Sequence, residues 1–179
     1  MKKIIFDFNK PNKWQKDFKE FQESYNKAIE LSAEDLKDKL NNKLNQNMAK
    51  YRVFNQDVRA KTGVYIDKNA DEYRLVIDSN SDITPFIEYG VGIVGSRNPH
   101  SKANEFGWKY DINNHGEAGW LFPITDNYNY NPEYIIYING KPFYHTRGHG
   151  AYPFMYETWL YGRRIANNVI RKYIRRAKW

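Results

Sequence analysis

The feature that most constrains the fold of this chain is a helical periodicity in its N-terminal third. Between residues 12 and 50, apolar side chains recur at steps of three and four, which places them on one face of a helix. Ser32 is followed three residues later by Asp35, a capping-box spacing that marks a helix start. The sequence therefore predicts two helices, at about 12–30 and 33–50. Their apolar faces consist of Trp14, Phe18, Phe21, Tyr25 and Ala28 in the first helix, and of Leu36, Leu40, Leu44 and Met48 in the second.

Strand patterns follow in residues 62–92. Residues 62–67 and 72–79 are rich in β-branched and aromatic side chains, and a polar turn lies between them. Residues 83–92 contain Pro85 and two glycines, so any strand here is not a regular central one. We expect most of 62–92 to be strand. A short strand is also expected at the N-terminus, in residues 3–8.

A hairpin is predicted at 133–145, where one strand pattern ends in the turn dipeptide Asn139-Gly140 and a second begins at once. A final helix is expected over 152–178. These elements predict an α+β fold: N-terminal helices and a long C-terminal helix packed on a mainly antiparallel sheet of four or five strands. A chain of 179 residues is long enough to bury its own core, and we expect a single domain over residues 1–179.

Residues 93–132 form a long loop inserted in this pattern. A loop of this length inside a compact domain usually has a function or becomes ordered against a partner. The high density of rings argues against simple disorder. Either these rings are exposed for another protein, or they fold back as a small satellite core. The aromatic residues are Phe106, Trp108, Tyr110, Trp120, Phe122, Tyr128 and Tyr130.

Positive charge is concentrated at the C-terminus. The net charge is +7, and no acidic residue follows Glu157. A basic terminal helix suits contact with DNA or with an acidic protein partner. Alternatively, the cations favour the helix dipole and keep the helix soluble. The basic residues that we assign to this contact are Arg163, Arg164, Arg171, Lys172, Arg175 and Arg176.

The composition excludes several classes of protein. There is no cysteine, so disulfides, thiolate metal sites and cysteine nucleophiles are excluded. No apolar run is long enough to span a membrane, and the N-terminal run is too short for a signal peptide. We therefore expect a cytoplasmic protein with no membrane contact.

The sequence offers no convincing active site. His145 and His149 have a spacing that suits metal binding on a helix, but Gly148 and Gly150 remove the helix, and no carboxylate lies beside them. The glycine-rich stretch 90–95 lacks the Lys-Ser/Thr pair of a phosphate loop and reads as a flexible turn. We expect no catalytic residue, no metal and no cofactor. Two alternatives stay open: a small metal-dependent nuclease that uses His145, His149 and an acid, and a sequence-independent nucleic-acid-binding module.

Two stretches of this sequence resemble a known family. FIEYGVG at 86–92 is similar to a YVEFGTG-like segment of that family. TRGHGAYPFMYETW at 146–159 resembles its closing motif, in which a loop delivers a Pro-Phe pair into the last helix. The family is that of the head–tail joining proteins of siphophages, also called neck or tail-completion proteins. The resemblance covers residues 33–175, and this chain departs from the pattern in its longer 93–132 loop and in the residues that follow Pro-Phe.

The resemblance implies a non-enzymatic virion protein that assembles in the host cytoplasm. In the virion neck it would form a homo-oligomeric ring of six or twelve subunits between the connector, or head-completion protein, and the tail-tube or tail-terminator protein. A ring needs exposed apolar contacts. The residues that we expect at subunit or partner interfaces are Phe86, Glu88, Tyr89, Phe106, Trp108, Trp120 and Phe122.

On the same interpretation, residues 146–154 are a structural hinge rather than a catalytic loop. Gly148 and Gly150 are expected to adopt positive φ, which lets the chain turn after a strand. Pro153 fits the first turn of a helix, and Phe154 begins the apolar face of that helix.

Overall fold

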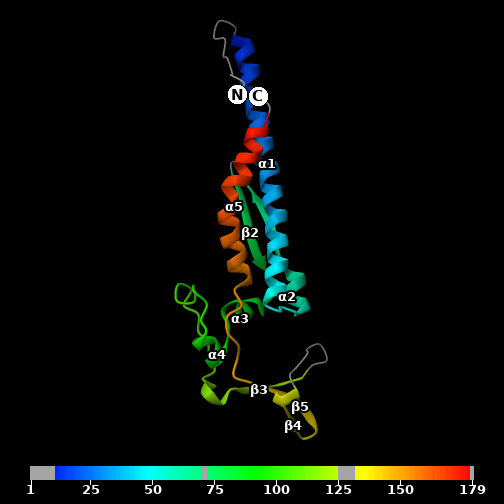
Figure 1. Cartoon of the computed structure of the whole chain (residues 1–179), viewed down its shortest axis with the longest axis vertical. Helices are drawn as coiled ribbons and strands as arrows, with labels where there is room; N and C mark the ends of the chain where they lie inside the picture. Colours follow the sequence, from blue (N-terminus) through cyan, green and yellow to red (C-terminus); the bar gives the residue numbers. More distant parts are fainter. Residues whose placement is uncertain (1–10, 70–71, 125–131, 178–179) are drawn as a thin grey trace. The chain divides into compact units, whose positions relative to one another are not determined.

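The computed structural model describes residues 11–69, 72–124 and 132–177, and its fold is α+β (Figure 1). The chain divides into two compact units. The first comprises the residues up to 45, 63–78 and those from 158 on; the second comprises 46–62 and 79–157. The expected strand at 3–8 lies outside the described residues.

The N-terminal helical region is one helix, α1 (Pro11–Lys50), so the predicted break at Ser32 is wrong. The Ser32 hydroxyl donates a hydrogen bond to the carbonyl of Ile29, 2.7 Å away, within the helix. It therefore does not cap a new helix start. No glycine or proline lies between Asn12 and Lys50, so nothing in the backbone forces a break.

The first unit packs α1 against α5 (Phe154–Arg176) and against a two-stranded sheet of β1 (Thr62–Lys68) and β2 (Tyr73–Ser79). Figure 1 shows α5 running beside α1. The predicted leucine face of α1 is confirmed as core. The buried side chains of this unit include Leu36, Leu40, Leu44, Val64 and Val169.

Two polar features fix this packing. The side-chain amide of Asn41 pairs with the backbone of Val64: its oxygen accepts the N–H at 3.1 Å and its nitrogen donates to the carbonyl at 3.4 Å. Lys172 of α5 forms an ion pair of 3.8 Å with Asp35 of α1. These pairs tie both the hairpin and α5 to α1.

The aromatic half of the α1 face is only partly buried. Ala28 is 5% exposed, whereas Phe18 and Tyr25 are 49% and 39% exposed. The rings of Phe21 and Tyr25 stack at 6.2 Å. The expectation that this stripe is core therefore holds for Ala28 and not for Phe18 or Tyr25.

The second unit contains short helices where strands were predicted. After α2 (Gln56–Lys61), the segment 83–92 folds as α3 (Thr84–Tyr89) followed by α4 (Gly92–Arg97). Pro85 lies in the first turn of α3, where its missing N–H costs nothing, and Gly90 ends this helix with φ 82°. The strand prediction for 62–92 is thus confirmed at β1 and β2 and wrong after Ser79.

The second sheet lies in the same unit and has the order β3-β5-β4. Its strands are β3 (Trp120–Pro123), β4 (Ile135–Ile138) and β5 (Lys141–Thr146), and both pairings are antiparallel. The predicted hairpin is confirmed: Asn139 and Gly140 form its turn with φ of 51° and 75°. Instead of one sheet, the five described strands form two, and one of them, β3, lies inside the segment expected to be loop.

The other described residues of the inserted segment are the end of α4, turns and the 3-10 helix η1 (Gly116–Ala118). A second 3-10 helix, η2 (Pro132–Tyr134), begins at its last residue. Tyr128 and Tyr130 lie outside the described residues. The C-terminal helix prediction is confirmed, with a start at Phe154.

Candidate assembly site

The two stretches that carry the family resemblance meet in the second unit; we call this contact, between residues 86–92 and 147–156, the junction. Val91 and His149 exchange two backbone hydrogen bonds, of 3.0 and 3.1 Å, as an isolated antiparallel bridge. Tyr152 N–H donates to the carbonyl of Ile87 at 3.0 Å. Segments about sixty residues apart in the chain are thereby joined backbone to backbone.

Glu88 occupies the centre of the junction. Its side chain accepts the backbone N–H of Met155 at 3.0 Å and that of Tyr156 at 2.8 Å, one on each carboxylate oxygen. These N–H groups belong to the first turn of α5, where no carbonyl of the helix can accept them and where the helix dipole favours an anion. Glu88 is 5% exposed, so it is a helix cap rather than the exposed contact that we expected.

His100 lies beside Glu88 and is equally buried, at 5% exposure. Its Nδ1 accepts the backbone N–H of Lys102 at 3.0 Å. In the neutral ring the proton is then on Nε2, which faces a Glu88 oxygen 3.6 Å away. The rings of Tyr89 and Tyr156 enclose the imidazole, with centroids 4.6 and 5.1 Å from it.

Glycine is required where the backbones of the junction approach each other. A Cβ on Gly148, where φ is 91°, would lie 1.9 Å from the carbonyl oxygen of Val91. A Cβ on Gly92 would lie 2.4 Å from the carbonyl oxygen of Arg147. The interpretation of 90–95 as a flexible turn is therefore wrong, because this stretch is packed against 147–151.

The hinge prediction is confirmed in part. Gly148 has positive φ as expected, but Gly150 does not. Pro153 lies next to the first turn of α5, as expected: it directly precedes the helix, and its carbonyl accepts the N–H of Glu157 at 2.9 Å. Phe154 is fully buried, and its own carbonyl accepts a hydrogen bond from the Asn47 amide.

An aromatic cluster covers one side of the junction. Tyr89 stacks on Trp108 at 5.2 Å and meets Phe106 edge-on at 5.9 Å. Trp108 also contacts Phe86 at 5.6 Å, and its indole N–H donates to the carbonyl of Gly90 at 3.0 Å. Two of the rings are nevertheless largely solvent-accessible, since Phe86 is 42% and Phe106 69% exposed.

The apolar side chains of the inserted loop thus divide into some that fold back and some that are exposed. Trp108 folds back onto the junction, and Phe122 packs on Tyr144 of β5 at 5.5 Å between centroids. Phe106 and Ile112 stay exposed, Ile112 at 67%.

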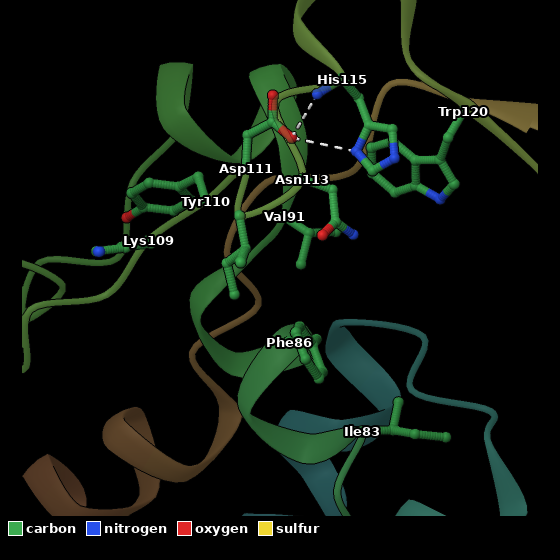
Figure 2. A pocket seen from close by; sticks show the side chains of 10 residues that line it. Ile83, Phe86, Val91, Lys109, Tyr110, Asp111, Asn113, His115 and Trp120 are labelled. Carbon is green, nitrogen blue, oxygen red and sulfur yellow. Dashed lines mark hydrogen bonds and ion pairs between the residues drawn. The ribbon is translucent and has the colours of Figure 1, made fainter.

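An open pocket of about 510 Å³ lies beside this cluster; we call it the apolar pocket (Figure 2). Asp111 shapes one wall by accepting the backbone N–H groups of His115 and Gly116, at 2.9 and 2.7 Å. These bonds lower the pKa of Asp111, so its carboxylate is anionic at neutral pH. Trp120 closes another wall and packs on His115 at 4.8 Å. The lining residues are Ile83, Phe86, Val91, Lys109, Tyr110, Asp111, Ile112, Asn113, His115 and Trp120.

The basic residues of α5 divide into two groups. Lys172 is paired with Asp35, whereas no arginine of the helix has an ion pair within the described residues. Arg163 and Arg164 lie over the rings of Trp159 and Tyr161, at 4.8 and 5.7 Å. Arg164, Arg171 and Arg175 are spaced by seven and four residues, so they share one exposed helix face, which we call the arginine face. None of these three has an ion pair within the described part of the chain. Arg176, near the helix end, is exposed as well.

The histidines considered for a nuclease contact backbone oxygens. His145 Nε2 lies 2.8 Å from the carbonyl of Ala118, and His149 Nδ1 lies 2.8 Å from that of Gly150. The nearest downstream acid, Glu157, accepts hydrogen bonds from Lys50 and Tyr51. Among residues 11–69, 72–124 and 132–177, no three His, Asp or Glu side chains gather where they could hold a metal ion.

Sequence reasoning missed the Glu88 cap, His100 and the Asp111 turn. Only Asp111 left a local signal, because an Asp ahead of a glycine commonly accepts nearby backbone N–H groups.

No helix in the described part of the chain has the length and apolar character needed to cross a membrane. Comparisons of this chain with protein-family models, with curated proteins and with solved structures find no match.

Proposed function

We propose that this protein is a structural subunit of the head–tail interface of a phage and that it assembles as a ring with copies of itself. The observation that carries the proposal is the contact between residues 86–92 and 147–156, which we call the junction. The two segments that resemble the family motifs contact each other through Glu88, the Val91–His149 bridge and closely packed glycines. Two short similarities that meet in one buried contact support a common structural role better than either does alone.

The exposed apolar groups beside the junction support assembly. Phe86, Phe106 and Ile112 are 42%, 69% and 67% exposed, and Ile83 on the pocket rim is 41% exposed. Exposed apolar patches of this kind mark protein–protein contact sites. A heterologous contact between two different patches closes into a ring when its rotation is an integral fraction of a turn.

Light scattering after size exclusion tests the proposal, over a wide concentration series at low and high salt. We expect a ring-sized species that grows with concentration and persists at high salt, because apolar contacts are not screened. Ile112→Ser is expected to reduce this species. Phe54→Ser is the matched control, since Phe54 is exposed to a similar degree, 72%. A monomer at every concentration, or equal effects of both substitutions, would contradict the proposal.

The arginine face favours nucleic-acid binding as a second candidate function. Three exposed arginines without carboxylate partners in the described residues form a row along α5, whereas the α1 lysines 16, 19, 27, 37 and 39 pair with acids on α1 itself. Such a row contacts phosphates without reading sequence. Salt-dependent binding of duplex DNA by the purified protein tests this candidate, and the absence of binding at low salt would exclude it.

A further inference from the structure

The apolar pocket is a candidate acceptor site at one end of the second sheet. Its rim is made by exposed apolar side chains: Ile83, which directly precedes α3, Phe86 of α3, and Ile112 of the loop. Trp120, the first residue of β3, forms its far wall (Figure 2). Lys109, Asp111, Asn113 and His115 also line the pocket. This mixed lining suits an apolar side chain that carries a polar group, such as tyrosine.

Strand β4 is an exposed apolar donor in the same unit. It lies at an edge of the sheet in the order β3-β5-β4. Ile136 and Ile138 point to one face and Tyr137 to the other, and they are 44%, 41% and 71% exposed. Natural edge strands are usually protected by lysine, proline or a bulge. This strand, IIYI, carries none of these.

The register of the sheet places strand β4 and the apolar pocket at different ends of β5. Trp120 pairs with Thr146 at one end of β5, whereas Ile138 pairs with Lys141 at the other end. The five residue steps between Thr146 and Lys141 span about 16 Å at ~3.3 Å per residue. A hairpin therefore cannot reach the pocket of its own chain without breaking the sheet, but it can reach that of another copy.

We propose that the β4–β5 hairpin of one copy docks in the apolar pocket of the next, with Tyr137 as its anchor. This inference rests on the proposed ring and names its contact. Donor and acceptor are different surfaces at opposite ends of one sheet, which is an arrangement that can repeat around a ring. An exposed tyrosine that enters a neighbouring apolar pocket is also a typical hot spot of protein interfaces.

Charge complementarity supports a second copy as the occupant. Lys141 follows the hairpin turn, is exposed and has no ion pair within the described residues. Asp111 on the pocket wall is held anionic by its backbone hydrogen bonds. The other charged residue of the wall, Lys109, lies on the side away from Trp120 (Figure 2). Docking would bring Lys141 toward Asp111 while the apolar side chains are buried.

Cross-linking between engineered cysteines tests the contact, because the natural chain contains no cysteine. Asn113→Cys places a thiol on the pocket wall, and Ile138→Cys places one beside Tyr137. The two single variants are mixed and treated with a short bifunctional thiol reagent. We expect a mixed cross-linked dimer, and from the double variant a ladder of higher species. Phe54→Cys mixed with Asn113→Cys is the control, because Phe54, at 72% exposed, is more accessible than Ile138, at 41%.

The outcomes separate this contact from the ring itself. If the protein forms rings but Asn113→Cys links no better to Ile138→Cys than to Phe54→Cys, the contact is wrong and the ring proposal stands. Strong linking of Ile138→Cys to itself would show β4 pairing edge to edge, and would overturn the proposal in favour of a symmetric dimer. A monomer without cross-links at every concentration overturns both. Tyr137→Asp is expected to reduce both the mixed dimer and the ring.

Discussion

Glu88 caps the start of α5 with its buried side chain. Its carboxylate satisfies two N–H groups at the start of α5 that have no partner within the helix, and it does so from a segment far away in sequence. Hydrogen bonds to a charged group are stronger than neutral ones, and leaving such a group buried without them is costly. The residue therefore couples the start of α5 to α3.

We expect Glu88→Gln to lower the free energy of unfolding by about 1–2 kcal/mol and Glu88→Ala by about 2–4 kcal/mol, because the first keeps one acceptor and the second keeps none. Chemical denaturation measures both. The control is Glu20→Gln on the exposed face of α1, which is expected to change stability by less than about 0.5 kcal/mol. Equal effects at the two positions would show that Glu88 does not act as a cap.

Gly148 is expected to be the least tolerant glycine of the junction. A Cβ there would overlap the carbonyl oxygen of Val91, so Gly148→Ala should cost about 3 kcal/mol or more, through displacement of the bridge. Gly107 is the control. Its φ is also positive, at 61°, but no atom lies within 4 Å of its added Cβ. Gly107→Ala should cost only about 1 kcal/mol, from backbone strain alone. Thermal unfolding of both variants makes the comparison.

His149 gives the stability a pH dependence. Burial lowers the pKa of His149 below its usual 6.5, because the charged ring is poorly solvated where it stacks on Tyr152. As pH falls below 6.5, the unfolded chain takes up a proton on this ring before the folded chain does. The free energy of unfolding must therefore fall with pH in this window, from its full value above 6.5 down to the lowered pKa.

Denaturation between pH 7 and pH 5 measures this slope, and NMR titration of the ring measures the pKa directly. His149→Gln should flatten the slope, whereas His145→Gln, on β5, should leave the part due to His149 in place. A titration midpoint of His149 at or above 6.5 would contradict the assignment.

At the scale of elements, local signals located most of the secondary structure. The type I′ turn at Asn139-Gly140, the leucine face of α1 and the last helix follow directly from spacing and turn chemistry. Helix α3 was missed although its signal was present: Pro85 in the first turn and Gly90 just after the end are the usual punctuation of a helix. From the sequence, Pro85 and the two glycines of residues 83–92 instead predict an irregular strand.

The continuity of α1 predicts a small effect of Ser32→Ala. A true N-cap serine loses about 1 kcal/mol when replaced by alanine. Ser32 lies inside the helix and bonds to the preceding turn, and alanine is the better helix former, so we expect a change within about 0.5 kcal/mol. Circular dichroism and denaturation of the variant provide the measurement. A loss of about 1 kcal/mol or more would restore the two-helix interpretation.

At the scale of the whole molecule, the sequence could not predict which polar residues would meet. Glu88 and Met155 are far apart in the chain, and their contact depends on the path of everything between them. The sequence likewise could not predict that Trp108 of the inserted loop packs onto Gly90. The density of rings argues only against simple disorder of the loop, and the fold shows which of its described rings are exposed.

The charge distribution also belongs to this scale. If the arginine face binds DNA, each arginine releases about one counterion, so replacing Arg164, Arg171 and Arg175 by glutamine should reduce the slope of log K against log salt by about 2–3. Fluorescence anisotropy with a labelled duplex measures this slope. Replacing Lys16, Lys19 and Lys27 by glutamine is the control, because these lysines already pair with acids on α1. Equal losses would indicate a general effect of net charge.

The Val91–His149 bridge and the Glu88 cap on α5 join the two segments that flank residues 93–146. Residues 93–146 are therefore an insertion closed at its base, and Gly95, His100 and Trp108 within it also pack on the junction. Because loop-closure entropy grows only slowly with length, about 0.6 kcal/mol for each doubling, the insertion can be lengthened at positions away from these contacts at little cost to the junction. The closed base makes this region the natural place to graft a new binding specificity.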